Sequence, residues 1–267
     1  MRWLKWRGLP DQGARDGDSP PLLEGGLVME RAVKAHAKSL LQRIIPRPFD
    51  GEVFLAGGAF KPLINPAQGV RDLDLWVRDR KVRERLVDHL IDCGAELVHD
   101  FKPYCIKFER RGQLIEITYQ NVKQRPISEI VEGFDIACCA IAATYDGGQV
   151  TDCYVSPRAV DSASCREVML TEGYIRRLQE NRPPDILQSL DRMRRFSEEV
   201  DFELPERVSE RLWQVFEEDY SDEEREACVD TYLSTTVNYK GRCNFDVLRR
   251  ASGGGGRVPV EEALLVS

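Results

Sequence analysis

The chain has 267 residues, 31% of them charged, and a formal net charge of −7, which is the composition of a globular protein and not of a basic nucleic-acid coat. No apolar stretch approaches the roughly 20 residues that span a bilayer, and residues 1–8 are not followed by the apolar segment of a secretory signal. The eight cysteines form no Cys-x-x-Cys pair and only three histidines accompany them, which argues against a zinc site and favours reduced thiols. We therefore expect a cytoplasmic protein with no membrane partner.

The pattern of apolar residues predicts alternating helices and strands in the first half of the chain. In chain order these are a helix at 28–44, a strand at 52–56, a short helix ending at 64, a strand at 72–77, a helix at 80–93, strands at 104–109 and 114–119, a short helix at 127–132, and an apolar run of either type at 136–145. Beyond residue 160 the character changes, and four segments favour helix, at 166–181, 185–200, 206–218 and 222–234.

This order of elements indicates an α+β protein, in which a small mixed sheet flanked by helices is followed by a helical C-terminal domain. The boundaries that composition suggests are a loose leader at 1–27, the domain that carries the sheet at 28–160, the helical domain at 161–250 and a flexible tail at 251–267.

Two aspartates on one predicted strand are the first sign of chemistry. Asp72 and Asp74 stand at positions i and i+2, so their side chains leave the same face, while Leu73, Leu75 and Val77 point to the core. Neighbouring carboxylates repel each other, a cation between them offsets the repulsion, and Mg²⁺ prefers carboxylate oxygen. An isolated Asp-x-Asp is more often an exposed acidic strand, so this motif alone does not define a site.

The segment upstream of the aspartates supplies a place for phosphate. Gly57 and Gly58 directly follow an apolar strand and open a short helix, so backbone N–H groups can approach a phosphate closely at a helix N-terminus. Lys61 stands one turn further on and can reach the same phosphates. A lone Gly-Gly is usually a tight turn. The ordered combination of strand, Gly-Gly, short helix and Asp-x-Asp strand is much more specific.

The segments Phe54-Leu-Ala-Gly-Gly-Ala-Phe-Lys61 and Val70-Arg-Asp-Leu-Asp-Leu-Trp-Val77 together resemble the polymerase-beta-like nucleotidyltransferase superfamily. They look most like the branch of CCA-adding enzymes and bacterial poly(A) polymerases, and they are similar to small phage-encoded nucleotidyltransferase-like proteins. The resemblance implies a third carboxylate on a later strand, and Glu116 stands at that place, with an exposed charge on an alternating strand as the alternative. CCA-adding enzymes usually have Arg-Asp shortly after the Gly-Gly, whereas this chain has Lys61-Pro62, so we do not expect a housekeeping tRNA-repair enzyme.

Two later stretches extend the resemblance. Asp135, in Glu132-Gly-Phe-Asp-Ile136, matches a Phe-Asp element of the phage-type relatives and is a candidate nucleotide-binding residue, although it could equally cap a turn or helix. The segment 190–196 looks like the helix that follows the catalytic domain in CCA-adding enzymes, where arginines read the base or bind phosphate. By this analogy the candidates for nucleotide binding are Arg192, Arg194 and Arg195, with a solvated basic helix face as the alternative.

Three functional hypotheses follow. The first is an enzyme that moves a nucleoside monophosphate from a nucleoside triphosphate, ATP included, onto an acceptor hydroxyl. Its catalytic ligands of two Mg²⁺ or Mn²⁺ ions would be Asp72, Asp74 and Glu116, with Asp135 as the alternative third carboxylate. An RNA 3′ end is the preferred acceptor, and a protein or a small molecule is the alternative. The second hypothesis is an inactive nucleotide- or protein-binding module with the same fold. The third is an antitoxin-like or structural partner that assembles through the apolar tail 258–267. The oligomeric state stays open, and a phage origin would place the protein in the host cytoplasm.

Overall fold

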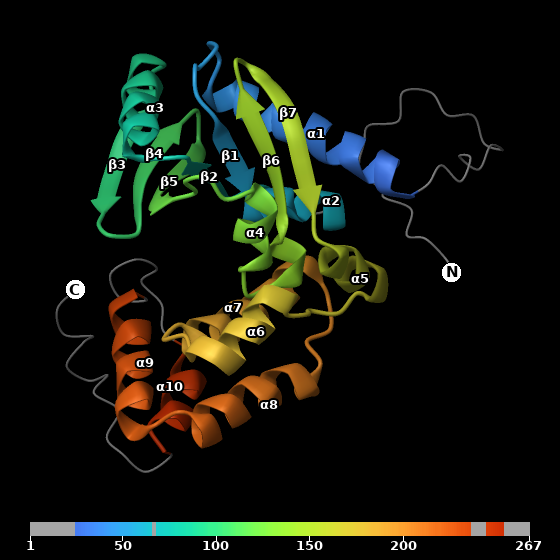
Figure 1. Cartoon of the computed structure of the whole chain (residues 1–267), viewed down its shortest axis with the longest axis vertical. Coiled ribbons are helices and arrows are strands. Elements are labelled where there is room, and N and C mark those ends of the chain that lie inside the picture. Colours follow the sequence, from blue (N-terminus) through green and yellow to red (C-terminus); the bar gives the residue numbers. More distant parts are fainter. Residues whose placement is uncertain (1–24, 66–67, 236–243, 254–267) are drawn as a thin grey trace.

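A seven-stranded mixed sheet organises the first half of the molecule (Figure 1). The structure is a computed structural model, and it describes residues 25–65, 68–235 and 244–253. The strand order is β3-β4-β5-β2-β1-β6-β7, and only the β2–β5 pair among these neighbours is parallel. The strands are β1 Val53–Ala56, β2 Asp72–Val77, β3 Glu96–Phe101, β4 Cys105–Arg110, β5 Gln113–Asn121, β6 Ile141–Asp146 and β7 Gln149–Val155.

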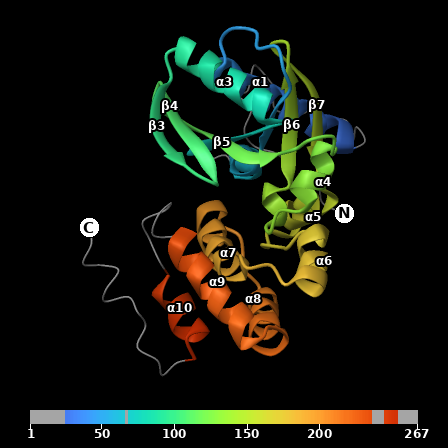
Figure 2. The ribbon, with the colours of Figure 1, turned by 60° about the vertical axis from the view of Figure 1, so that its left-hand side comes forward.

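Helices cover the sheet and then form a separate group. Those that accompany the sheet are α1 Gly25–Ile44, α2 Lys61–Ile64, α3 Arg80–Asp92, α4 Ile127–Glu132 and α5 Pro157–Cys165. The group that follows is α6 Glu172–Asn181, α7 Ile186–Val200, α8 Glu206–Gln214, α9 Asp222–Thr235 and α10 Phe245–Ala251. We use "sheet half" for the described residues up to residue 155 and "helical half" for α6 to α10, which lie below the sheet in both views (Figures 1 and 2). The predicted α+β architecture is confirmed.

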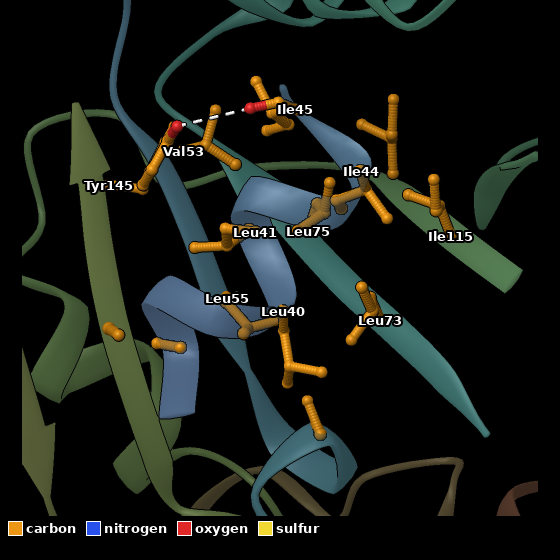
Figure 3. Close-up of a cluster of buried hydrophobic side chains, with 14 of the residues drawn as sticks. Leu40, Leu41, Ile44, Ile45, Val53, Leu55, Leu73, Leu75, Ile115 and Tyr145 are labelled. Carbon is orange, nitrogen blue, oxygen red and sulfur yellow. Dashed lines mark hydrogen bonds between the residues drawn. The ribbon is translucent and has the colours of Figure 1, made fainter. Parts of the chain in front are cut away.

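The core between α1 and the sheet decides which way the strands face (Figure 3). Leu41 of α1, Leu55 of β1 and Leu73 of β2 are fully buried in one cluster, where each such side chain contributes about 1.5–3 kcal/mol of apolar burial. The Tyr145 hydroxyl donates a hydrogen bond of 3.5 Å to the carbonyl oxygen of Ile45 at the end of this cluster. Since alternate residues of β2 are committed to this core, the residues between them face the opposite side of the sheet.

The helical half has a core of its own. Leu190, Met193 and Phe196 recur at a spacing of three along α7 and are at most 6% exposed. They pack in one buried cluster with Tyr174 of α6 and Trp213 of α8. The stripe fixes which face of α7 is buried, and therefore which side chains of α7 are left to face the sheet half.

Most predicted elements are confirmed, but the predicted helix at 166–181 is wrong in its first part. Arg166 has φ 56° and ends α5, and the amide of Val168 donates to the carbonyl oxygen of Glu203 at 2.8 Å instead of continuing a helix. The Thr171 side chain then accepts a hydrogen bond from the Tyr174 amide and caps the start of α6. Residues 166–171 are thus an extended connection between two helices. The sequence analysis did not predict β3, β7, α5 or α10.

Three expectations concern regions or features outside the regular elements. Nearly all of the predicted leader and most of the predicted tail, including the apolar segment 258–267, lie outside the described residues. Across the described ranges, every helix is too short or too polar to cross a bilayer. None of the cysteines in the described part of the chain takes part in a disulfide.

Candidate active site

The parallel pairing of β2 and β5 brings three carboxylates to one face of the sheet. Asp74 is the register partner of Glu116, and Asp72 is the partner of Leu114. Register partners on neighbouring strands point to the same side, so Glu116 lies beside the Asp72–Asp74 pair. The side chain of Glu116 is only 7% exposed and that of Asp72 is 17% exposed. The strand register therefore places the three acids that the sequence analysis singled out next to one another.

The Gly57-Gly58 turn lies directly beside this acidic group. Ala56, the last residue of β1, pairs with Asp74, so the chain enters the turn next to that carboxylate. Gly57 has φ +79°, and a Cβ atom built there would lie 3.3 Å from Oδ2 of Asp74. A side chain at this position would be strained and would crowd the acid, which explains why glycine is needed. Lys61, one turn later, forms an ion pair with Glu199 of α7 and lies 5.5 Å from the centre of the Phe196 ring.

The surroundings of Asp74 disfavour the charged form of its carboxylate. Burial is the main cause that raises its pKa, to about 7, and the charges of Asp72 and Glu116 raise it further. Arg192 and Arg71 oppose the shift without cancelling it. A cation bound against Asp74 would relieve the same repulsion.

We tested whether these residues fit a metal ion. Over the described residues, no three Asp, Glu, His or Cys side chains are arranged as a metal-binding group. Asp72 Oδ2 accepts a hydrogen bond from Nη2 of Arg71 at 2.9 Å, and Glu116 Oε1 lies 2.8 Å from Nζ of Lys107. Asp72 and Asp74 nevertheless offer the hard oxygen donors that Mg²⁺ prefers. Burial, followed by the charges of Asp72 and Glu116, raises the pKa of Asp74, and a bound cation would favour its charged form. The pair of aspartates fits a divalent ion, whereas Glu116 already has a cationic partner.

Two adjoining cavities meet at the acidic group, with volumes of about 630 and 980 Å³. Each is lined by side chains of both the sheet half and the helical half. Between them they are lined by all ten site residues that the sequence analysis named: Gly57, Gly58, Lys61, Asp72, Asp74, Glu116, Asp135, Arg192, Arg194 and Arg195. Residues spread over 139 positions of the sequence are therefore brought to one place, from 57 to 195.

The Asp135 carboxylate does not join the Asp72–Asp74 pair but contacts the helical half. Asp135 is 4% exposed, its Oδ1 lies 3.3 Å from Nη2 of Arg192, and the same oxygen accepts a hydrogen bond from the Ile136 amide at 2.9 Å. The Asp135 charge is the largest cause that raises the pKa of Arg192. Arg194 lines the larger cavity, is 56% exposed, and lies 3.7 Å from Glu198 and 3.7 Å from Asp246.

The sequence analysis missed a polar group at the start of α7 that lines the smaller cavity. Arg177 Nη2 lies 3.5 Å from Asp185 Oδ2 in an ion pair. Within the described part of the chain, Oδ1 of Asp185 and Oε1 of Gln188 are buried without a hydrogen-bond partner. Buried polar atoms of this kind normally find a partner, so they point to a polar ligand or water in the cavity. The i, i+3 spacing of Asp185 and Gln188 places both side chains on one face of a helix, whereas Pro183-Pro184 before them indicates only where the helix begins.

Comparison with known proteins finds a likeness in fold. No family model matches the sequence, and no curated protein matches it either. Among solved structures, a CCA-adding enzyme with ATP is similar at 15% identity and a TM-score of 0.50, over 90% of this chain and 56% of that chain. A tRNA-processing enzyme in an apo form has 15% identity and a TM-score of 0.48, over 82% of this chain and 54% of that chain. A Thermotoga maritima CCA-adding enzyme complexed with tRNA has 14% identity and a TM-score of 0.46, over 86% of this chain and 51% of that chain.

These likenesses concern the fold alone. The chain spans a little more than half the length of the structures it matches, so part of those proteins has no counterpart here. The similarity to the CCA-adding enzyme with ATP supports the nucleotidyltransferase-like fold that the motifs predicted. None of the three bears on the small phage-encoded proteins, and that part of the resemblance stays a prediction.

Proposed function

We propose that this protein is a metal-dependent nucleotidyltransferase, which moves a nucleoside monophosphate from a nucleoside triphosphate onto an acceptor hydroxyl. The observation that carries the proposal is the juxtaposition of Asp72 and Asp74 with the Gly57-Gly58 turn at the meeting point of two cavities. A metal ion and a triphosphate are what such a combination recognises.

The reaction needs an acceptor oxygen to attack the α-phosphorus of the triphosphate. One oxygen–phosphorus bond forms, the bond to the bridging oxygen of the β-phosphate breaks, pyrophosphate leaves, and the hydroxyl proton passes to solvent. Mg²⁺, or Mn²⁺ in its place, held by Asp72 and Asp74 would offset charge on the phosphates and lower the pKa of the attacking hydroxyl. Amides of the Gly57-Gly58 turn would hold the phosphates, and Lys61 would exchange Glu199 for a phosphate oxygen.

An RNA 3′ end is the acceptor that we propose first. Three observations support this choice: the exposed Arg194 beside the larger cavity, the ATP and tRNA named with the similar structures, and the likeness of the fold to theirs. A protein or a small molecule is the alternative acceptor. We also propose that the protein acts in the cytoplasm, where nucleoside triphosphates are plentiful.

Labelled nucleotides test the proposal. Each α-labelled triphosphate is incubated with Mg²⁺, pooled RNA and a protein extract, using the wild type and the isosteric Asp72→Asn/Asp74→Asn variant. We expect label on RNA with the wild type and a loss of at least about 1000-fold with the variant, because it removes the metal's charged ligands. The matched control is Asp88→Asn/Asp92→Asn, at two exposed positions of α3. Equal transfer by the wild type and the Asp72/Asp74 variant would refute the proposal.

One observation favours a second candidate, an inactive nucleotide-binding module. Arg71 and Lys107 contact Asp72 and Glu116, so two of the three acids already have a cationic partner from the protein. Mg²⁺-dependent binding of a triphosphate without transfer to any acceptor would identify this case.

A further inference from the structure

Lys107 is built into the acidic group from the neighbouring strand. It is the register partner of Glu116 in the antiparallel β4–β5 pair, and its Nζ lies 2.8 Å from Glu116 Oε1. The two side chains are 17% and 7% exposed, so this ion pair is largely removed from water. Both residues line the larger cavity together with Asp72 and Asp74.

Further contacts hold the pair in place. Lys107 Nζ lies 5.6 Å from the centre of the Phe101 ring, where the face of the ring attracts a cation. The second oxygen of Glu116, Oε2, lies 3.7 Å from the thiol sulfur of Cys105. An ion that approached Glu116 would have to displace an ammonium at contact distance from a carboxylate with little exposed surface.

We propose that the ammonium of Lys107 takes the place of one of the two cations, so that the site binds a single divalent ion, on Asp72 and Asp74. The inference rests on the proposed function and refines it. Two-metal sites hold their ions roughly 3.5–4 Å apart, so a second ion would need oxygen ligands beside Asp72 and Asp74, and Glu116 is the neighbouring carboxylate. Lys107 balances the charge of Glu116 and one divalent ion balances the charges of Asp72 and Asp74, so a second divalent ion would have no carboxylate of this group left to itself. Lys107 is therefore a positioning residue, which fixes Glu116 and supplies a permanent positive charge.

Manganese stoichiometry tests this directly. The full-length protein with one equivalent of a non-hydrolysable α,β-methylene triphosphate is titrated with Mn²⁺, and bound ions per chain are counted by equilibrium dialysis and electron paramagnetic resonance. We expect one bound Mn²⁺ for the wild type. Lys107→Met exposes the charge of Glu116 and should bind two, and Lys107→Met/Glu116→Gln should return to one. Lys34→Met, which removes a lysine paired with Glu30 on α1 at 2.6 Å, should match the wild type.

The outcomes separate the inference from the function on which it rests. Two ions in the wild type, or one in Lys107→Met with the thermal unfolding curve intact, would overturn the inference and leave the proposed function standing. No Mn²⁺-dependent binding of the analogue by the wild type would overturn both. If Lys107→Met unfolds, the wild type is compared with Glu116→Gln, and both should bind one Mn²⁺ per chain. Two bound ions in the wild type and one in Glu116→Gln would refute the inference.

Discussion

The two halves of the molecule build their sides of the site in different ways. In the sheet half, strand register fixes the acids: Asp74 lies opposite Glu116, and the Gly57 turn begins beside Asp74 because β1 pairs with β2 there. In the helical half, by contrast, long side chains of α7 reach across the gap. Arg192 contacts Asp135 and Glu199 contacts Lys61, each through an ion pair.

This contrast indicates a division of labour. Backbone hydrogen bonds hold the acidic side, so it can move only if the sheet itself is distorted. The basic side depends on side-chain pairs that a phosphate can replace one by one. We therefore expect substitutions beside the acids to change the rate of transfer most, and substitutions in the ion pairs with α7 to change nucleotide affinity and stability.

Among the substitutions that test this contrast, Gly57→Ala should have the largest effect. A methyl group at φ +79° and 3.3 Å from Asp74 should destabilise the fold by about 1–2 kcal/mol and displace the carboxylate, lowering transfer roughly 100-fold. Gly112→Ala is the matched control, because Gly112 has φ +75° but no atom within 4 Å of its built Cβ. Both variants should lose similar stability in urea unfolding, and only Gly57→Ala should lose activity. Equal activity losses would break the argument from register.

The Asp135–Arg192 pair should have the next largest effect, on stability. Asp135→Asn leaves a partly buried guanidinium without its charged partner, and we expect a loss of about 1–3 kcal/mol in the free energy of unfolding. Asp201→Asn removes an exposed pair with Arg166 of 2.7 Å and should cost no more than about 1 kcal/mol. If the two variants unfolded at the same denaturant concentration, Asp135 would not be a link between the halves.

Glu199→Gln should change affinity and little else. The substitution removes the charge that competes with phosphate for Lys61, so triphosphate should bind roughly threefold to fivefold more tightly. Fluorescence titration with a labelled triphosphate measures this, with Glu180→Gln at an exposed position of α6 as the control. Weaker binding in Glu199→Gln would mean that Glu199 positions Lys61 for phosphate and does not compete with it.

The sequence predicted the acidic side of the site better than the rest because its signals are local. Asp72 and Asp74 lie two residues apart on one strand, and their shared face follows from strand geometry alone. Glu116 needed the resemblance, since nothing in the sequence states that β5 pairs with β2. Lys107 could not be predicted as its partner, because their pairing depends on the turn that sets the β4–β5 register.

The helical half shows where such signals end. Helix α7 was predicted at 185–200 and found at Ile186–Val200, yet its periodicity says nothing about which element its polar face meets. The burial of the Asp185 and Gln188 oxygens cannot be predicted from local sequence, because they line a cavity that both halves of the molecule form. Strand β3 was missed for another reason: its first five residues are exposed, so it lacks the alternation that marks a half-buried strand.

The smallest expected effect concerns the contact between α1 and the segment that follows Gly57. His36 of α1 has its Nε2 2.8 Å from the carbonyl oxygen of Ala59, and burial lowers its pKa. The neutral ring is therefore favoured in the folded protein, while the unfolded chain takes up a proton near the ordinary histidine pKa. The stability that this provides is present at neutral pH and is lost as pH falls through that value.

Between pH 7.5 and 5.5 the raised pKa of Asp74 should add stability to the wild type and to His36→Gln alike, whereas titration of His36 should remove stability from the wild type alone. We therefore expect the melting temperature of the wild type, relative to that of His36→Gln, which keeps a donor but does not titrate, to be a few degrees lower at pH 5.5 than at pH 7.5. His99→Gln, at an exposed position of β3, should keep the wild-type slope. All three histidines precede residue 100, so the helical half contributes no histidine titration to this window. Identical slopes for the wild type and His36→Gln would show that the turn is held by its own backbone. The contrast between an acidic side fixed by strand register and a basic side held by side-chain ion pairs would then not depend on α1.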